Sequence, residues 1–283
     1  MKIINTLETA RHIAKQVKAC GNRIAFVPTM GNLHEGHLSL VRKARELADF
    51  VIVSIYVNSM QFGHNEDFDT YPKTFAADKH HLEQENVDAV FAPTEKIMYP
   101  EGQTDHTRIQ LDCLDGMHCG LSRPQFFSGV ATVVTKLFNI VTPDVAVFGE
   151  KDFQQLCVIK KIVHDLMMPV EIVSGPTCRD ENGLALSSRN NYLTHTEKKK
   201  AAGLYALIQK VASKISAGER DYTRLSQFGI EQMQESGFVP DYFNIVSTKT
   251  LKPPSDDESS LVILAACTLN NIRLIDNMQI QID

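Results

Sequence analysis

Two histidines three residues apart, His34 and His37, are the first side chains in this sequence whose types and spacing could do chemistry. They lie in the segment PTMGNLHEGH, residues 28–37. The apolar run at 24–27 predicts a buried strand before them, and apolar residues at helical spacing over 38–47 predict a helix after them. Residues three apart share one face of a helix, so we expect the two imidazoles to lie side by side.

A strand, a glycine-bearing turn and a helix in this order direct backbone N–H groups and the positive end of the helix dipole at a bound group. A phosphate is the natural guest of such a turn, and neutral imidazoles can hydrogen-bond to its oxygens or protonate them. The glycines follow neither G-x-G-x-x-G nor the P-loop pattern. Two other readings stay open: polar capping of the helix start, or half of a metal site, although no second His or Cys pair at ligand spacing follows nearby.

An amide pair follows the next apolar strand, predicted over 50–57. Ligands of open α/β sheets bind outside the carboxyl ends of the strands, and Asn58 and Gln61 stand at such an end. An amide can donate to a carboxylate or hydroxyl and can also accept, so Gln61 is a candidate substrate contact. The alternative is an ordinary surface glutamine.

Charged and hydroxyl groups at two further points could add phosphate contacts. Lys151 follows the strand predicted over 144–148 and would bring a permanent positive charge. The segment 186–190, LSSRN, offers Ser187, Ser188 and Arg189, because a hydroxyl together with a guanidinium can grip a polyphosphate. A solvated lysine and ordinary turn serines are the alternatives.

The remaining elements must position these groups. We predict helices over 6–20, 74–86, 130–141 and 152–167, with strands over 87–92 and 170–173. Asn5 with Glu8 is expected to form a capping box, with Gly21 as the helix stop. This alternation predicts an α/β fold, a Rossmann-like doubly wound parallel sheet, over 1–177.

From about 178 the pattern changes to helices followed by strands. A helix is predicted from the capping box Thr194 and Glu197 to near Gly218 and another over 222–236, then strands over 241–246, 261–267 and 272–275. We therefore expect a second, smaller α+β domain over 178–283, joined by a hinge near 178.

Composition excludes several classes of protein. At 283 residues with a formal net charge of −5, the chain has no basic footprint for nucleic acid. No apolar run approaches the length of a membrane span, and the start carries no signal-peptide pattern. Six cysteines without a C-x-x-C suit reduced thiols, so a cytoplasmic protein is expected.

The His-x-Gly-His box resembles the signature of the nucleotidyltransferase superfamily. The longer string PTMGNLHEGH resembles pantothenate synthetases, the pantoate–β-alanine ligases. The resemblance continues in order through VNSMQF, FGEKDFQQ, LALSSRN and RLIDN at 273–277, and so covers nearly the whole chain.

This resemblance implies ATP-dependent condensation of pantoate with β-alanine to pantothenate, AMP and pyrophosphate, through a pantoyl adenylate. It implies ATP as a substrate, Mg²⁺ with protein ligands that cannot be named, and a homodimer. Catalytic roles would fall to His34, His37, Lys151, Ser188 and Arg189, and pantoate or β-alanine contacts to Gln61, Gln155 and Asn58. ATP contacts would come from the four motif segments: Met30, Gly31, Asn32, Leu33, His34, Glu35, Gly36, His37, Gly149, Glu150, Lys151, Asp152, Cys178, Leu186, Ser187, Ser188 and Arg189. The Ser-Ser-Arg loop would play the part of the mobile loop of the class I tRNA synthetases, delivered to ATP by domain closure.

The sequence departs from the family pattern at a few places. Ser59 replaces a usual proline, which we expect to loosen the turn that aims Gln61. The stretch 125–128, QFFS, replaces one that carries a histidine, and Cys178 replaces an aliphatic residue. Two alternatives to the ligase remain: a nucleotidyltransferase that stops at adenylyl transfer, and a non-catalytic nucleotide-binding protein.

Overall fold

The computed structural model describes residues 1–63, 66–255 and 257–282. Within these residues the strands form a six-stranded parallel sheet and a three-stranded antiparallel sheet. The chain divides into two compact units. The first holds Met1–Asp115, Arg123–Glu150 and Gln155–Pro176, and the second holds Gly116–Ser122, Lys151–Gln154 and the chain from Thr177 onward. Position 283, the end of the predicted second domain, lies outside the described residues, and the boundary at 177/178 stays a prediction.

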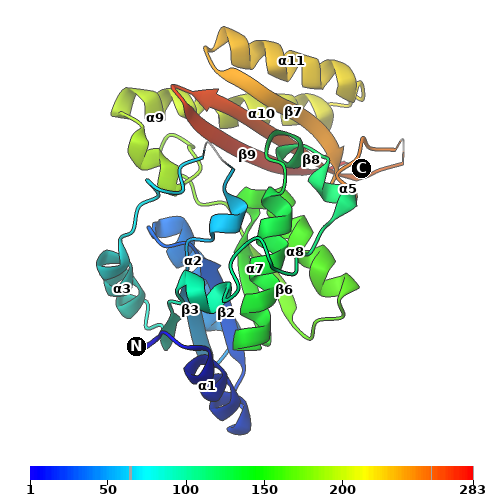
Figure 1. Cartoon of the computed structure of the whole chain (residues 1–283). Coiled ribbons are helices and arrows are strands. Elements are labelled where there is room, and N and C mark those ends of the chain that lie inside the picture. Colours follow the sequence, from blue (N-terminus) through cyan, green and yellow to red (C-terminus); the bar gives the residue numbers. More distant parts are fainter. Residues whose placement is uncertain (64–65, 256, 283) are drawn as a thin grey trace. The chain divides into compact units, whose positions relative to one another are not determined.

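The parallel sheet of the first unit has the strand order β1-β4-β3-β2-β5-β6 (Figure 1). The order reverses between β2 and β5, as in doubly wound folds, and the predicted fold class is confirmed. The strand bounds are β1 (Lys2–Ile4), β2 (Ile24–Thr29), β3 (Phe50–Ile55), β4 (Ala89–Phe91), β5 (Val145–Gly149) and β6 (Glu171–Gly175).

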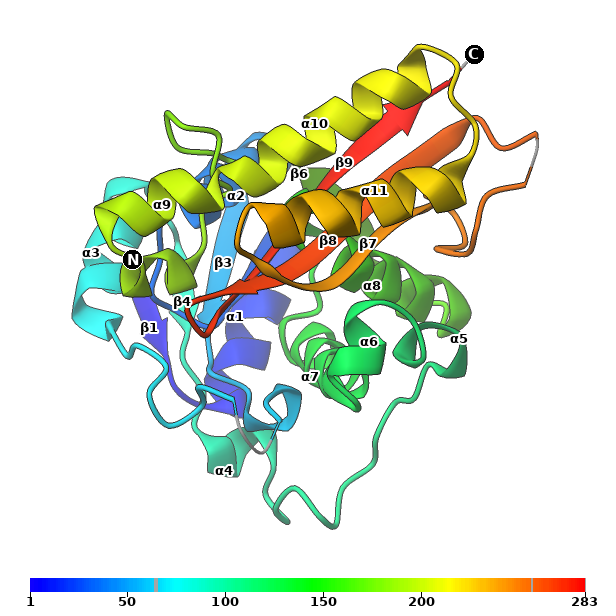
Figure 2. The same ribbon diagram turned by 90° about the horizontal axis from the view of Figure 1, so that it is seen from above.

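Helices cover both faces of this sheet, which explains why its central strands β2, β3 and β5 are mostly apolar and buried. Val27, Val53 and Val147 point to one face, where they pack with Val41 of α2 and Leu82 of α3. On the other face Phe26 meets Phe138 of α7 edge-to-face, and α7 runs beside α8 in both ribbon views (Figures 1 and 2). The bounds are α1 (Leu7–Ala19), α2 (Glu35–Leu47), α3 (Phe75–Gln84), α7 (Phe126–Val141) and α8 (Phe153–Asp165), with shorter turns η1 (Ser59–Gln61), α4 (Glu95–Met98), α5 (Asp112–Asp115), α6 (Cys119–Ser122) and η2 (Glu150–Asp152).

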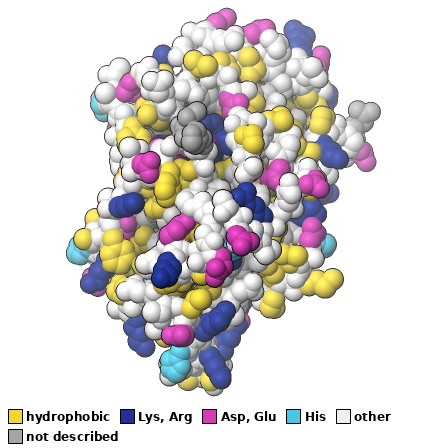
Figure 3. All heavy atoms as spheres, viewed as in Figure 1, with side chains coloured by type: hydrophobic (Ala, Val, Ile, Leu, Met, Phe, Trp, Pro, Cys, Tyr) yellow, Lys and Arg dark blue, Asp and Glu magenta, His cyan; other side chains and the backbone are white. Residues whose placement is uncertain are grey.

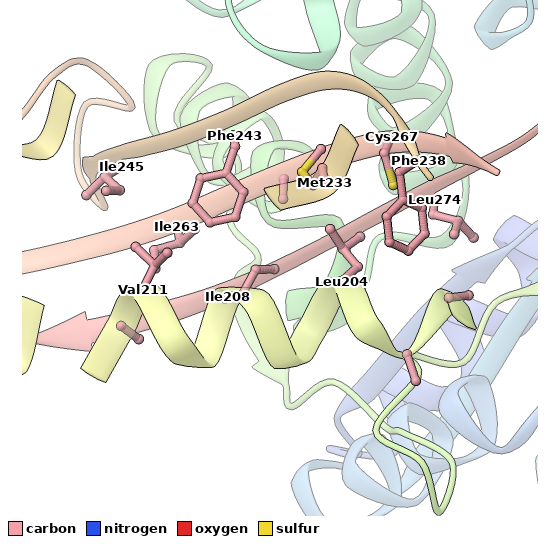
Figure 4. Close-up of a cluster of buried hydrophobic side chains, with 14 of the residues drawn as sticks. Leu204, Ile208, Val211, Met233, Phe238, Phe243, Ile245, Ile263, Cys267 and Leu274 are labelled. Carbon is pink, nitrogen blue, oxygen red and sulfur yellow. The ribbon is translucent and has the colours of Figure 1, made fainter. Parts of the chain in front are cut away.

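The second unit packs helices on one antiparallel sheet of strand order β7-β8-β9. Figure 2 shows α10 and α11 lying along this sheet. Leu204, Ile208 and Val211 project from α10 toward Phe243 and Ile263 of the sheet (Figure 4). The bounds are β7 (Val239–Ser247), β8 (Ser260–Leu269), β9 (Ile272–Gln281), η3 (Ser188–Tyr192), α9 (His195–Ala201), α10 (Gly203–Ser216) and α11 (Tyr222–Glu235).

Several predicted details were wrong. The cap of α1 is Thr6, whose side chain accepts the N–H of Thr9, instead of the predicted Asn5–Glu8 box. The helix predicted from Thr194 to Gly218 is interrupted at Ala202. The strand β1 was not predicted, and β9 extends to Gln281, well beyond the predicted end at 275. The capping box of Thr194 with Glu197 is confirmed.

The surface in Figure 3 carries Lys and Arg side chains interspersed with Asp and Glu. The described residues on this face therefore form no large patch of a single sign of charge. Among the described helices, none is long and apolar enough to cross a membrane.

Candidate active site

His34 and His37, in the first unit, cap the start of α2. Nδ1 of His34 accepts the N–H of Gly36 at 3.1 Å, and Nδ1 of His37 accepts the N–H of His34 at 3.3 Å. The rings lie together, with centroids 4.0 Å apart, so the predicted shared face is confirmed. Because each Nδ1 acts as an acceptor, the neutral rings carry their proton on Nε2. The capping and the phosphate interpretations are therefore compatible, since they use different nitrogens.

The turn before the histidines differs from the expected phosphate cradle. Gly31 and Asn32 both have left-handed backbones, with φ of 83° and 52°. The N–H groups of Asn32 and Leu33 donate to the buried carboxylate of Asp78, at 3.0 and 2.8 Å. Asp78 therefore occupies these two N–H groups, and the phosphate site expected at the turn and helix start stays a prediction.

Sequence reasoning missed Asp78, which lies in α3 and is 1% exposed. It also accepts the hydroxyl of Thr74 at 3.0 Å. The available signal was a carboxylate four residues before the buried Leu82, on the inward side of a helix. Asp78 thereby fixes the turn on which the histidines stand.

Gln61 is held in a defined orientation at the carboxyl end of β3. Nδ2 of Asn58 donates to Oε1 of Gln61 at 3.1 Å and to the carbonyl of Gly129 at 3.2 Å. The hydroxyl of Tyr99 donates to Oδ1 of Asn58 at 2.7 Å. Burial, with Glu95 nearby, raises the pKa of Tyr99, so the phenol stays a donor. Nε2 of Gln61 is thereby directed toward Sδ of Met30, 3.2 Å away.

The places where the chain departs from the family pattern have partners of their own. Ser59 donates to Glu95 at 2.7 Å, so its hydroxyl fastens the turn instead of loosening it. The ring of Phe126 lies 3.7 Å from the guanidinium of Arg123, which also donates to the carbonyl of Gln61. Gln125 begins α7 with φ of 68°, a conformation that costs a non-glycine residue energy.

A cavity of about 320 Å³ lies beside Met30 and Gly31 in the first unit. Its walls are mainly apolar, and Lys73, Asp78 and Glu95 are its charged lining residues. Gln61 contacts its lining residue Met30, and such a space suits a small ligand with an apolar part.

The second unit holds the other predicted phosphate groups. Lys151 lies in η2 and pairs with Asp152 at 3.7 Å. Ser187 caps η3 by accepting the N–H of Arg189, so its hydroxyl has a local role. The N–H of Leu186 donates to the carbonyl of Cys178 at 2.9 Å, which closes the hairpin that leads to this turn.

Two other predicted site residues lie in the first unit. Gln155 lies in the first turn of α8. The carboxylate of Glu150 accepts the hydroxyl of Ser174 at 2.8 Å.

A doubly wound parallel sheet with imidazoles and amides at the carboxyl ends of its strands defines a nucleotide-binding type of α/β protein. A family model described as Pantoate-beta-alanine ligase matches residues 2–279. The chain therefore belongs to the pantoate-beta-alanine ligase family, and it is a ligase.

Individual relatives agree over the full chain. A pantothenate synthetase of Marinobacter nauticus is 49% identical over 280 residues, which cover 99% of each chain. The crystal structure of pantothenate synthetase from Thermus thermophilus superimposes with a TM-score of 0.91 at 41% identity, covering 98% of this chain and 99% of that one. A pantoate-beta-alanine ligase from Francisella tularensis, crystallised with β-γ ATP and β-alanine, is 34% identical with a TM-score of 0.82, covering 98% and 97%.

Proposed function

We propose that this ligase condenses pantoate with β-alanine at the expense of ATP. The pantoate carboxylate attacks the α-phosphorus of ATP, which forms pantoyl adenylate and releases pyrophosphate. The β-alanine amine then attacks the acyl carbon, loses a proton and displaces AMP. The observation that carries the proposal is the oriented Gln61 amide in the same unit as the paired imidazoles, in a chain whose relatives are named for this reaction.

The proposed roles follow from the chemistry of each group. His34 and His37, with a proton on Nε2, would donate to phosphate oxygens, and Lys151, Ser188 and Arg189 would add charge and donors. Preorganised donors of this kind stabilise the charge that develops on the phosphates. Gln61 and Gln155 would hold pantoate. Asn58 is 1% exposed and bonded to Gln61, Gly129 and Tyr99, so we propose that it orients Gln61.

ATP would be used together with Mg²⁺. The described residues contain no group of three or more His, Cys, Asp or Glu side chains that could hold a metal ion. Mg²⁺ bound to nucleotides commonly keeps several waters and takes only one or two carboxylates from the protein. In this proposal Mg²⁺ arrives bound to ATP and would neutralise part of the phosphate charge, so it needs no cluster of protein ligands. We also propose a cytoplasmic homodimer, from the family resemblance and from the absence of disulfide spacing among the six cysteines of the sequence.

The test is to follow both products with purified protein, Mg²⁺ and ATP. Pantoate alone should support exchange between ATP and labelled pyrophosphate, and AMP should be released only when β-alanine is added. Exchange driven equally by β-alanine alone would reject the adenylate mechanism. Pyrophosphate release without any amine-dependent AMP would favour an adenylyltransferase, and ATP binding without either product would favour a non-catalytic protein.

A further inference from the structure

Asn277 of β9 holds the backbone of Lys151. Its Nδ2 donates to the carbonyl oxygen of Lys151 at 2.8 Å, across 126 residues of sequence. Asn277 is 7% exposed, so water competes little for this bond. Lys151 follows the end of β5 closely, and both residues belong to the second unit.

The neighbouring residue, Asp276, holds a second segment. Its two carboxylate oxygens accept Nη1 and Nη2 of Arg179 at 2.6 and 2.8 Å, and Oδ1 also accepts the N–H of Asn277 at 2.8 Å. Arg179 stacks on the ring of Tyr205 at 3.3 Å. Two parallel N–H···O bonds of this kind fix direction as well as distance.

Arg179 in turn fixes the hairpin that leads to Ser187. Its Nη1 donates to the carbonyl of Gly183 at 3.1 Å, and its backbone pairs with that of Ala185 across the hairpin. Gly183 adopts φ of 92°, which the tight turn requires. The Arg179–Asp276 pair therefore ties both arms of this hairpin to β9.

Successive residues of a strand point to opposite faces of the sheet, so one dipeptide can hold two different segments. Asp276 shares its face with Leu274 and Met278, which pack in the apolar cluster of α10. A buried carboxylate and a buried amide cost desolvation energy that apolar residues would avoid. Their presence in this strand needs a reason beyond packing.

We propose that Asp276 and Asn277 are positioning residues for adenylate formation. Asn277 sets the backbone of Lys151, and Asp276 sets, through Arg179, the hairpin that carries Ser187, Ser188 and Arg189. The two predicted phosphate-binding segments of the second unit are thus anchored on one of its strands. This inference rests on the proposed role of Lys151 in phosphate chemistry.

The experiment is a double-mutant cycle measured on the separate half-reactions in single turnover. Lys151→Ala should slow adenylate formation by about 10²–10³-fold. Asn277→Ala should slow the same step by about tenfold, the effect of one lost hydrogen bond. With preformed pantoyl adenylate and β-alanine, the polyphosphate has already left, so Asn277→Ala should stay within about twofold of the wild type. In the Lys151→Ala background the carbonyl that Asn277 bonds remains but the ammonium group that it positions is gone, so Asn277→Ala should add less than about twofold.

Two further variants separate positioning from folding. Asn277→Asp keeps the side-chain volume but replaces the donor with an oxygen that repels the Lys151 carbonyl, so it should slow adenylate formation at least as much as Asn277→Ala does. Asn244→Ala is the matched control: this asparagine lies on β7 of the same sheet and bonds His118 at 2.8 Å. It should leave the ratio of the two half-reaction rates unchanged.

The outcomes test the positioning role of Asn277 separately from the proposed role of Lys151. Equal slowing of both half-reactions by Asn277→Ala, or its full effect in the Lys151→Ala background, would overturn the positioning role alone. Unimpaired adenylate formation in Lys151→Ala would instead overturn the assignment of the lysine.

Discussion

At the scale of single residues, the two nitrogens of the His34 ring have different proposed roles. Nδ1 of His34 caps α2, whereas Nε2 carries the proton that we assign to phosphate contact. Asparagine is a good N-cap, so His34→Asn should keep the cap and lose the Nε2 donor. We expect adenylate formation to fall by about 10²–10³-fold with little change in Tm.

The companion variant, His34→Ala, loses the cap as well, at a cost of about 1 kcal/mol in the free energy of unfolding. Thermal unfolding and single-turnover pyrophosphate release measured on both variants separate the two functions. A His34→Asn variant with normal adenylate formation would show that His34 serves only as a cap.

A half-buried histidine in the second unit, His118, makes stability depend on pH. Burial lowers the pKa of His118, partly offset by its bond to the carbonyl of Leu251 at 2.9 Å. The folded state therefore binds the proton less readily than the unfolded state. Neutral His118 contributes fully to stability above the pKa of the unfolded state, about 6.5. This contribution is lost as the pH falls from there through the lower pKa of the folded state.

The Tm of the wild type should therefore drop between pH 7.5 and pH 5.5 by more than that of His118→Gln. His12→Gln, on the exposed side of α1, is the control and should retain the wild-type drop. Identical pH profiles for the wild type and His118→Gln would contradict the prediction.

At the scale of elements, Gly129 lets α7 approach the turn that carries Gln61. A Cβ at this position would lie 2.3 Å from the carbonyl oxygen of Met60. Gly129→Ala should displace η1, raise the KM for pantoate and cost about 1–3 kcal/mol of stability by overpacking. Gly203→Ala is the control, because a Cβ there meets nothing within 4 Å at the start of α10. An unchanged KM for pantoate in Gly129→Ala would show that the turn does not depend on this approach.

The elements that could be predicted from the sequence are those formed by an unbroken run or a regular spacing of apolar residues. The runs at β2, β3 and β5 are such cases, and the motifs at their carboxyl ends located His34, Gln61 and Lys151. The predicted strand at 272–275 ends too early, because Asp276 and Asn277 of β9 break the apolar pattern. Local sequence rules commonly fail where polar residues are kept for a purpose other than packing.

The pairing of residues far apart in the sequence left no local signal. The partner of the Asn32 and Leu33 N–H groups is Asp78, more than forty residues away. The three-residue strand β1 pairs with β4, about 85 residues later, and is too short to show a period. Such long-range partners depend on tertiary packing, which a single sequence does not display.

At the scale of the whole molecule, the proposed homodimer predicts a definite mass. One chain weighs 31.7 kDa, so light scattering at micromolar concentration should report about twice this value. The measurement should be repeated at high salt, where screening weakens contacts between charged surfaces. A particle of single-chain mass under both conditions would reject the dimer.

The second unit takes in Lys151–Gln154, and this has a consequence for synthesis. Lys151 leaves the ribosome 126 residues before Asn277, the residue that fixes its backbone. A nascent chain already contains every histidine, lysine and serine of the proposed centre while the anchor is still untranslated. Chains that end before this strand would therefore carry the motifs without their geometry. We therefore expect the chain to become active only after β9 has been translated.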